Sequence, residues 1–171
     1  MKKLLLSILV LATMIACTSK ETTTEGEDPN MVLFRENAKV VDATFKAYCK
    51  KDINAFASAY SDTVKCHSAV YGESDISKAE IIKRSLGFFK LVNNLTAKVI
   101  LLPGVDETTL KPDGSVRAYI LWSGDAVNKA PKRDLKVYAS YKLDKDHKIY
   151  DADEYFDVTG FVNYATAAPA K

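Results

Sequence analysis

The sequence predicts an α+β fold in which three N-terminal helices pack in the concavity of a strongly curved, mainly antiparallel sheet, giving a cone-shaped α+β barrel. Between residues 31 and 93, apolar side chains recur at steps of three and four, which is the period of a helix with one buried face. After residue 94 they recur at every second position, which is the period of a strand. Helices followed by a run of strands are typical of the α+β class.

The first helix is expected where five apolar side chains share one face. They are separated by steps of four, three, four and three residues: Phe34, Ala38, Val41, Phe45 and Tyr48. Lys50 and Lys51 follow, and positive charge is favourable at the C-terminal end of a helix. Asp52 is then expected to cap a short second helix.

The third helix is expected to begin after Ser77. Ser77 and Glu80 have the spacing of a capping box, in which the two side chains satisfy backbone N–H groups at the start of a helix. The face of this helix that we expect to point inward consists of Ile82, Leu86 and Phe89.

Five strands are expected from the alternating segments. A short strand covers residues 64–70, and four more cover residues 96–102, 115–123, 135–143 and 148–158. Turn-forming residues such as proline, glycine, asparagine and aspartate separate the last four. The folded segment of about 135 residues is enough for one compact domain.

The last strand carries a charged residue on its apolar face. This face consists of Tyr150, Ala152, Glu154, Phe156 and Val158, and we expect it to point toward the helices. An ionised carboxylate among apolar groups is costly, so Glu154 should have a raised pKa or a partner, as a general acid or base does. The alternative is a glutamate that reaches solvent or a lysine.

Glu154 is therefore the candidate catalytic residue, and five residues are expected to line a ligand pocket around it. These candidates are Ser68, Phe89, Trp122, Tyr141 and Phe156. Trp122 is the only tryptophan, and its indole N–H needs a partner when buried, so we expect it to donate to Glu154 or to a ligand. The alternative for Trp122 is packing in the core.

The first seventeen residues have the pattern of a bacterial lipoprotein signal. Lys2 and Lys3 precede an apolar run over residues 4–15, which is too short to span a bilayer as a helix. Residues 14–17, Met-Ile-Ala-Cys, resemble a lipobox with Met in place of the usual Leu. We expect Cys17 to carry acyl chains, including palmitate, and to anchor the protein in the cell envelope, at the outer membrane facing the periplasm. The alternative is an ordinary signal peptide cleaved elsewhere.

Four segments follow from this pattern. Residues 1–16 are the signal peptide, 17–30 a lipidated cysteine with a flexible polar tether, 31–165 the folded domain and 166–171 a disordered tail. The chain has 24 basic and 22 acidic residues, and loss of the two leader lysines brings the net charge to zero. A neutral domain has no basic field for phosphate groups, so no nucleic-acid partner is expected.

Metal and cofactor sites are not expected. The two histidines, His67 and His147, and the remaining cysteines, Cys49 and Cys66, have no usual ligand spacing, and no phosphate-binding or dinucleotide motif is present. Cys49 and Cys66 are expected to be buried thiols, with a disulfide as the alternative in an oxidising periplasm.

Two segments resemble the nuclear transport factor 2-like superfamily, which includes SnoaL-like cyclases, ketosteroid isomerases and limonene epoxide hydrolases. They are residues 52–62, DINAFASAYSD, and the terminal strand with Lys148-Ile149 and Glu154-Tyr155-Phe156-Asp157. The resemblance covers residues 32–162 and implies a cone-shaped α+β fold. It also implies a homodimer through the outer face of the sheet, where Tyr119 and Leu121 would lie.

The resemblance does not carry over a complete catalytic set. The phenol and the catalytic aspartate of ketosteroid isomerases correspond to Thr44 and Ser68, which argues against steroid isomerisation. Limonene epoxide hydrolases have an acidic residue at the position of Glu154, but their other catalytic partners have no counterpart here.

Two functions are therefore weighed. The first is a lipid-anchored module that binds a small hydrophobic molecule in an apolar pocket. The alternative is a SnoaL-like or epoxide-hydrolase-like enzyme that uses Glu154 as general acid or base. The sequence leaves open the identity of the ligand, the oligomeric state and the membrane in which the protein is anchored.

Overall fold

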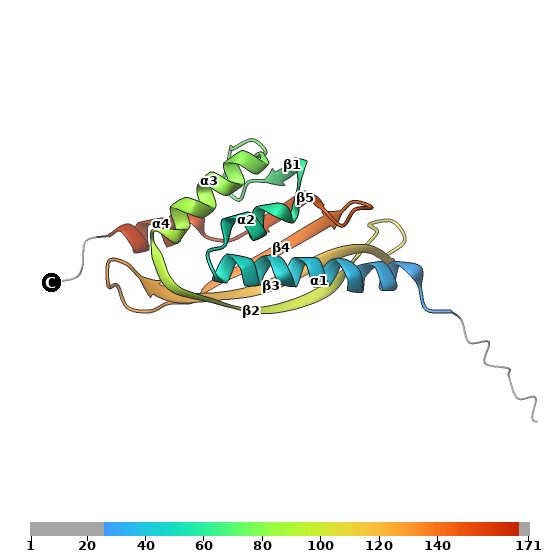
Figure 1. Cartoon of the computed structure of the whole chain (residues 1–171), viewed down its shortest axis with the longest axis horizontal. Coiled ribbons are helices and arrows are strands. Elements are labelled where there is room, and N and C mark those ends of the chain that lie inside the picture. The colour runs from blue at the N-terminus through green and yellow to red at the C-terminus, as the bar shows by residue number, and fades with distance from the viewer. Residues whose placement is uncertain (1–25, 168–171) are drawn as a thin grey trace, which may run out of the picture.

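A long first helix lies along the concave side of a five-stranded sheet (Figure 1). The computed structural model describes residues 26–167. The elements are α1 (Pro29–Cys49), α2 (Ile53–Ser58), β1 (Tyr60–His67), α3 (Lys78–Phe89), β2 (Val92–Val105), β3 (Pro112–Ala126), β4 (Leu135–Leu143), β5 (Ile149–Tyr155) and α4 (Val158–Thr166). The predicted α+β class, with helices in the concavity of a curved sheet, is confirmed.

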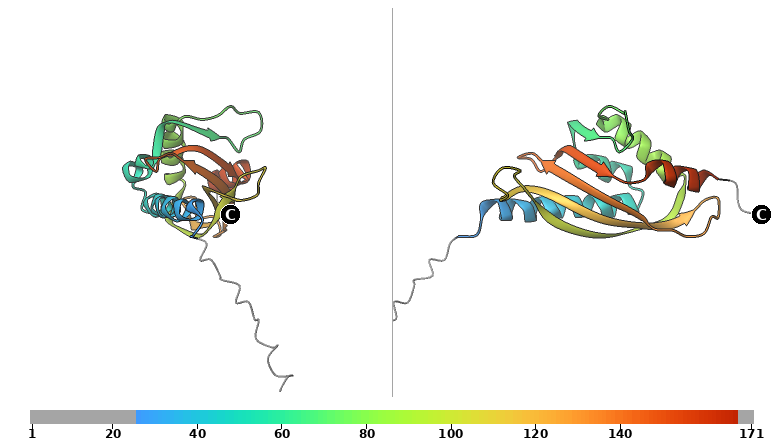
Figure 2. Two further views of the ribbon diagram at one scale, coloured as in Figure 1. Left: turned by 90° about the vertical axis from the view of Figure 1, so that its right-hand side faces the viewer. Right: turned by 180° about the vertical axis from the view of Figure 1, so that it is seen from behind.

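The sheet has the strand order β1-β5-β4-β3-β2. β1 pairs with β5 in parallel, and the other three pairs are antiparallel, so the sheet is mainly antiparallel as expected. The register of β2 and β3 shifts twice, between Asn93 and Thr96 and between Pro103 and Val105. Such irregularities bend strands, and Figure 2 shows β2 and β3 curving past the helices.

The core lies between α1 and the middle of the sheet. All five residues of the face predicted for α1 belong to the core or pack against it. Val41 and Phe45 belong to the same buried cluster as small residues of β3 and β4, among them Ala118 and Ala139. Small side chains in a sheet let a helix pack close to it.

The helix starts agree with the predicted caps. Asp52 accepts a hydrogen bond from the N–H of Ala55 at 3.0 Å, and Ser77 accepts one from Glu80 at 3.4 Å. The buried face of α3 differs from the prediction by one residue. Ile81 and Ser85 are buried, and Leu86 is exposed. Ser85 is polar, so the apolar pattern did not mark it as buried. Its side chain forms a hydrogen bond with the phenol of Tyr48.

The strand expected over residues 148–158 ends earlier and is followed by a helix that we did not predict. β5 stops at Tyr155, and α4 begins at Val158 after Asp157, which caps it by accepting a hydrogen bond from Gly160 at 2.8 Å. Apolar residues at helical spacing signal this helix: Val158, Phe161, Val162 and Ala165. The predicted strand extended the alternation of β5 into the first residue of this helix, which is wrong.

The predicted alternation of β5 also fails at its start. Ile149 is buried and Tyr150 is exposed, which is the reverse of the expectation. Lys142 pairs with Asp151, but the next residue, Leu143, pairs with Ile149, so Tyr150 is an extra residue in β5. An extra residue of this kind reverses the alternation. Between Ala152 and Tyr155, where β5 ends, the predicted alternation is confirmed.

The ends of the folded domain differ slightly from the expected boundaries. α1 begins at Pro29, inside the expected tether, after the cap Asp28. α4 continues to Thr166, one residue into the expected tail. The expected signal peptide, Cys17 and residues 168–171 lie outside the described residues. Within residues 26–167, no helix is both long and apolar enough to cross a membrane.

Candidate functional site

A cavity of about 810 Å³ lies between the concave face of the sheet and the helices. Such a volume accommodates a small organic molecule. All four helices and all strands contribute to its wall. Its lining is mostly apolar and aromatic, and includes Phe45, Tyr48, Phe56, Trp122, Val137 and Phe156.

Aromatic rings pack against one another along one side of this cavity. The ring of Tyr48 packs against Phe56 at 4.9 Å and Trp122 at 5.2 Å between centroids. Trp122 also contacts Phe45 at 5.8 Å. Edge-on contacts of this kind fix ring orientation in addition to burying area. Trp122 therefore packs in the core while lining the cavity, and no hydrogen bond joins it to Glu154 in the described part of the chain.

Glu154 faces the cavity from β5, as its predicted alternation requires. Its carboxylate accepts a hydrogen bond of 3.4 Å from the hydroxyl of Tyr141 on the neighbouring strand β4. Burial raises the pKa of Glu154, and this hydrogen bond opposes the effect in part. Within residues 26–167 no lysine or arginine forms an ion pair with it. The alternative of a lysine partner therefore does not apply to the described residues.

Three buried phenols and one thiol share the environment of Glu154. Burial raises the pKa of Tyr48, Tyr60 and Tyr141, and the nearby charge of Glu154 adds to the shift. The same two causes raise the pKa of the Cys66 thiol to about 12. At neutral pH these phenols stay protonated and act as hydrogen-bond donors. Tyr48 belongs to the face predicted as buried for the first helix, but neither Tyr48 nor Tyr60 is among the pocket residues expected from the sequence.

The other predicted pocket residues take different places. Phe156 lies in the cavity wall, and Ser68 lies at its rim, where its hydroxyl donates to Glu73. Phe89 does not line the cavity, which corrects our expectation. It packs against Tyr48 at 4.7 Å, and its neighbour Phe88 lines the cavity instead. The cause is the one-residue error in the buried face of α3.

Ion pairs hold the rim of the cavity between β1 and α3. Arg84 of α3 binds both carboxylate oxygens of Glu73, at 2.7 and 2.9 Å, and also pairs with Glu80 at 3.3 Å. The Arg84 guanidinium and the Ser68 hydroxyl lower the pKa of Glu73 to about 2. These contacts fasten the loop after β1 to α3 at the cavity entrance.

The missed helix α4 closes one end of the cavity. Phe161 and Tyr164 of α4 line it, and Phe161 packs on Phe88 of α3 at 5.5 Å. Asn128, in the loop after β3, donates hydrogen bonds to the carbonyl groups of Tyr164 and Ala167. The helix is therefore held from two sides at this end of the cavity.

The two thiols described by the structure, Cys49 and Cys66, are not joined by a disulfide. Cys66 is buried, and Cys49 is partly exposed. Thr44, at the position of the isomerase phenol, donates its hydroxyl to the carbonyl of Val40 in its own helix at 2.8 Å. It therefore offers no free donor to a ligand.

Comparison with known proteins identifies the fold. No family model and no curated protein matches the sequence. SalBIII, an epoxide hydrolase/cyclase-like enzyme in pyran ring formation in polyether salinomycin, is 13% identical, with a TM-score of 0.56 over 73% of this chain and 93% of SalBIII. A protein with a ketosteroid isomerase-like fold from Catenulispora acidiphila, in complex with trimethylamine, is 10% identical, with a TM-score of 0.58 over 74% of this chain and 91% of that one.

A third structure agrees with these two. It is a nuclear transport factor 2-like protein of unknown function from Exiguobacterium, 12% identical, with a TM-score of 0.56 over 70% of this chain and 98% of that one. The curved sheet with helices in its concavity is thus a known architecture. The chain described here has the nuclear transport factor 2-like fold.

Proposed function

We propose that the cone binds a small, mostly apolar molecule and holds a polar atom of that molecule near Glu154. The observation that carries this proposal is a cavity of about 810 Å³ with an aromatic wall and a carboxyl group hydrogen-bonded inside it. Apolar cavities with a few convergent polar groups are the usual form of small-molecule sites.

The polar groups of the cavity indicate which atom a ligand would present. The hydroxyl groups of Tyr48, Tyr60 and Tyr141 are donors in a buried setting. An oxygen acceptor, such as a carbonyl, ether or hydroxyl group, suits these donors. A strongly charged ligand does not suit this wall, because burial of an unpaired charge is costly.

The compared proteins support a site of this kind. One was solved in complex with trimethylamine, a small organic molecule, and SalBIII is named as an epoxide hydrolase/cyclase-like enzyme. Identities of 10–13% carry neither ligand nor reaction to this chain, so the class of ligand rests on the cavity itself.

A second candidate function is an enzyme that uses Glu154 as general acid or base. The observation that favours it is the burial of this carboxyl group, which raises its pKa above the ordinary value of a glutamate. Tyr141 would then orient the carboxyl group through its hydrogen bond. Binding and catalysis would use the same cavity, so an experiment has to separate them.

Intrinsic fluorescence provides a test, because Trp122 is the only tryptophan and lines the cavity. We expect 1-tetralone, a neutral aromatic ketone, to quench it saturably. Tyr141→Phe should weaken binding about 5- to 10-fold, because it removes the hydroxyl that turns from Glu154 to the ketone oxygen when the ligand binds. The matched control is Tyr138→Phe, on the same strand but the opposite face, which should bind as the wild type does.

Glu154→Gln separates the two functions. If the protein only binds its ligand, the affinity of Glu154→Gln for any detected ligand should stay within a few-fold of the wild-type affinity. An enzyme should lose turnover while it still binds. No saturable quenching by 1-tetralone or related neutral ketones and phenols, or equal effects of the two tyrosine variants, would contradict the proposed site.

We further propose that the protein is lipid-anchored through Cys17 in the cell envelope, at the outer membrane facing the periplasm. Two features of the sequence support this proposal. The first is the pattern of the leader, and the second is that residues 18–28 separate Cys17 from the start of α1. Mass spectrometry of protein extracted from membranes should show cleavage before Cys17 and the added mass of acyl chains. In Cys17→Ser this mass should disappear, whereas an unmodified Cys17 in the wild type contradicts the anchor.

We also propose that two copies pair through the outer face of the sheet. This face exposes large apolar side chains on neighbouring strands, with relative exposures of 62% for Ile100, 50% for Tyr119 and 60% for Tyr155. Tyr138 lies between the two tyrosines, with centroids 5.2 and 5.8 Å away. A continuous exposed apolar patch of this kind favours a two-fold interface.

Sedimentation velocity tests this pairing. The wild type should sediment as a dimer, and Tyr119→Lys should shift it to the monomer. Leu110→Lys is the matched control, because Leu110 is 73% exposed but lies in the loop between β2 and β3. A wild-type monomer at high concentration would refute the interface.

A further inference from the structure

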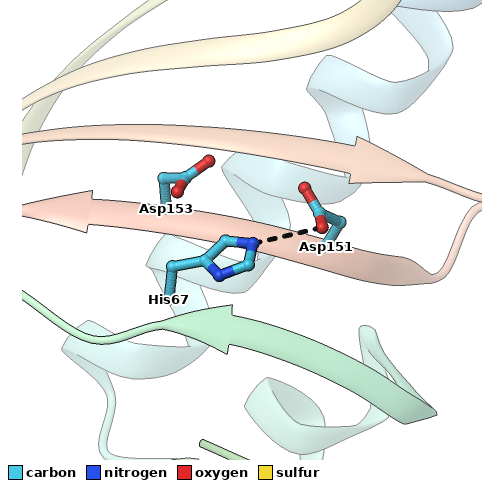
Figure 3. A group of neighbouring side chains, drawn as sticks. All are labelled: His67, Asp151 and Asp153. Carbon is cyan, nitrogen blue, oxygen red and sulfur yellow. Dashed lines mark hydrogen bonds and ion pairs between the residues drawn. The ribbon is translucent and has the colours of Figure 1, made fainter. Parts of the chain in front are cut away.

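A polar cluster lies on the face of β5 opposite to Glu154, beside the edge strand β1 (Figure 3). His67 ends β1, and its register partner on β5 is Asp153. Asp151 lies two residues earlier on β5 and therefore on the same face. Parallel pairing of the two strands thus brings together one imidazole and two carboxylates from distant parts of the chain.

The distances in this cluster suit a metal ion. One ligand atom from each of His67, Asp151 and Asp153 lies within 4.8 Å of the other two. Nε2 of His67 is 3.4 Å from an oxygen of Asp151. Atoms bound to one zinc ion at about 2.0–2.2 Å lie roughly 3.4 Å apart. Small side-chain rotations are enough to bring all three atoms to that spacing.

Each of the three side chains also makes a polar contact with a neighbouring residue outside the cluster. Nδ1 of His67 lies 2.8 Å from a carboxylate oxygen of Asp75, which leaves Nε2 directed at β5. Ser140 donates a hydrogen bond to Asp153 at 3.1 Å, and Lys142 lies 3.5 Å from Asp151. A histidine that binds a metal commonly gives its other ring nitrogen to a carboxylate in this way.

The charges around the cluster favour a cation. Three carboxylates meet there, those of Asp75, Asp151 and Asp153. The basic groups near them are Lys142 and the exposed Lys65, which lies on the same face of β1 as His67. With a neutral imidazole, three carboxylates against two ammonium groups leave an excess of one negative charge at this place.

We propose that His67, Asp151 and Asp153 bind a divalent first-row transition metal ion such as Zn²⁺, and that Asp75 positions His67. One imidazole and two carboxylates suit such an ion better than Mg²⁺ or Ca²⁺, which prefer oxygen ligands alone. Three protein ligands leave positions for water. The ion would link the edge strand β1 to β5, because it binds ligands from both strands, and would so stabilise the folded state.

The sequence predicted no metal site, because its histidines and cysteines have no usual ligand spacing. The proposed site departs from that prediction. His67 and Asp151 are 84 residues apart. Only the parallel register of β1 and β5 makes them neighbours. Asp151 and Asp153 lie across β5 from Glu154, whereas His67 also borders the cavity. The proposal rests on the cluster itself and not on the function proposed for the cavity.

Calorimetric titration with ZnCl₂ of the protein purified without a polyhistidine tag tests the site. We expect one ion per chain and a rise in the unfolding temperature with zinc concentration. His67→Gln and Asp153→Asn should each weaken zinc binding at least tenfold. Asp75→Asn should weaken it about tenfold while leaving the unfolding temperature of the metal-free protein unchanged.

The chain offers a matched control in its second histidine. His147 contacts Asn37 at 2.7 Å, away from the cluster, and His147→Gln should bind zinc as the wild type does. Absence of stoichiometric binding, or equal effects of the two histidine variants, would overturn the proposal. With Co²⁺ as the probe, a thiolate charge-transfer band would also overturn it, because the metal would then be bound by a cysteine.

Discussion

The alternation of side chains along β5 determines what the inside of the cone contains. β5 lies between β1 and β4, so both of its edges are paired and its two faces have different surroundings. Glu154 lines the cavity and Ala152 is buried, whereas Asp151 and Asp153 lie on the opposite face of β5. A shift of one residue would bury two aspartates and expose the glutamate. The cavity chemistry and the outer cluster therefore depend on the same register.

Retention of a carboxyl group inside the cone opposes stability. The surroundings of Glu154 are apolar, and its hydrogen-bond partner among the described residues is Tyr141, at the long distance of 3.4 Å. A leucine at this position would avoid the cost of burying a polar group. Groups that destabilise a fold in this way are found at functional sites more often than elsewhere. Tyr48 and Trp122, whose rings pack 5.2 Å apart, line the same cavity as this carboxyl group.

Much of this arrangement follows from regular periodicity, and the errors arise where periodicity is broken. The face of α1 was predictable because no irregularity interrupts its period, and the inward position of Glu154 was predictable because the extra residue of β5 lies before Ala152. Tyr150 was misplaced because an extra residue in a strand leaves no mark in composition. Phe89 was misplaced because Ser85, a polar residue, occupies the centre of the buried face of α3. The cluster at His67 was missed because its ligands meet only through tertiary structure.

The central claim is that the carboxyl group of Glu154 lies in the cavity with Tyr141 as its partner. A pH titration of the side-chain carboxyl carbons by NMR measures this directly, with Glu154→Gln used to assign the signal. We predict that the pKa of Glu154 lies above the ordinary value of a glutamate and rises further in Tyr141→Phe, because the hydrogen bond lowers it. A Glu154 signal that titrates at the ordinary value and is unaffected by Tyr141→Phe would contradict the account.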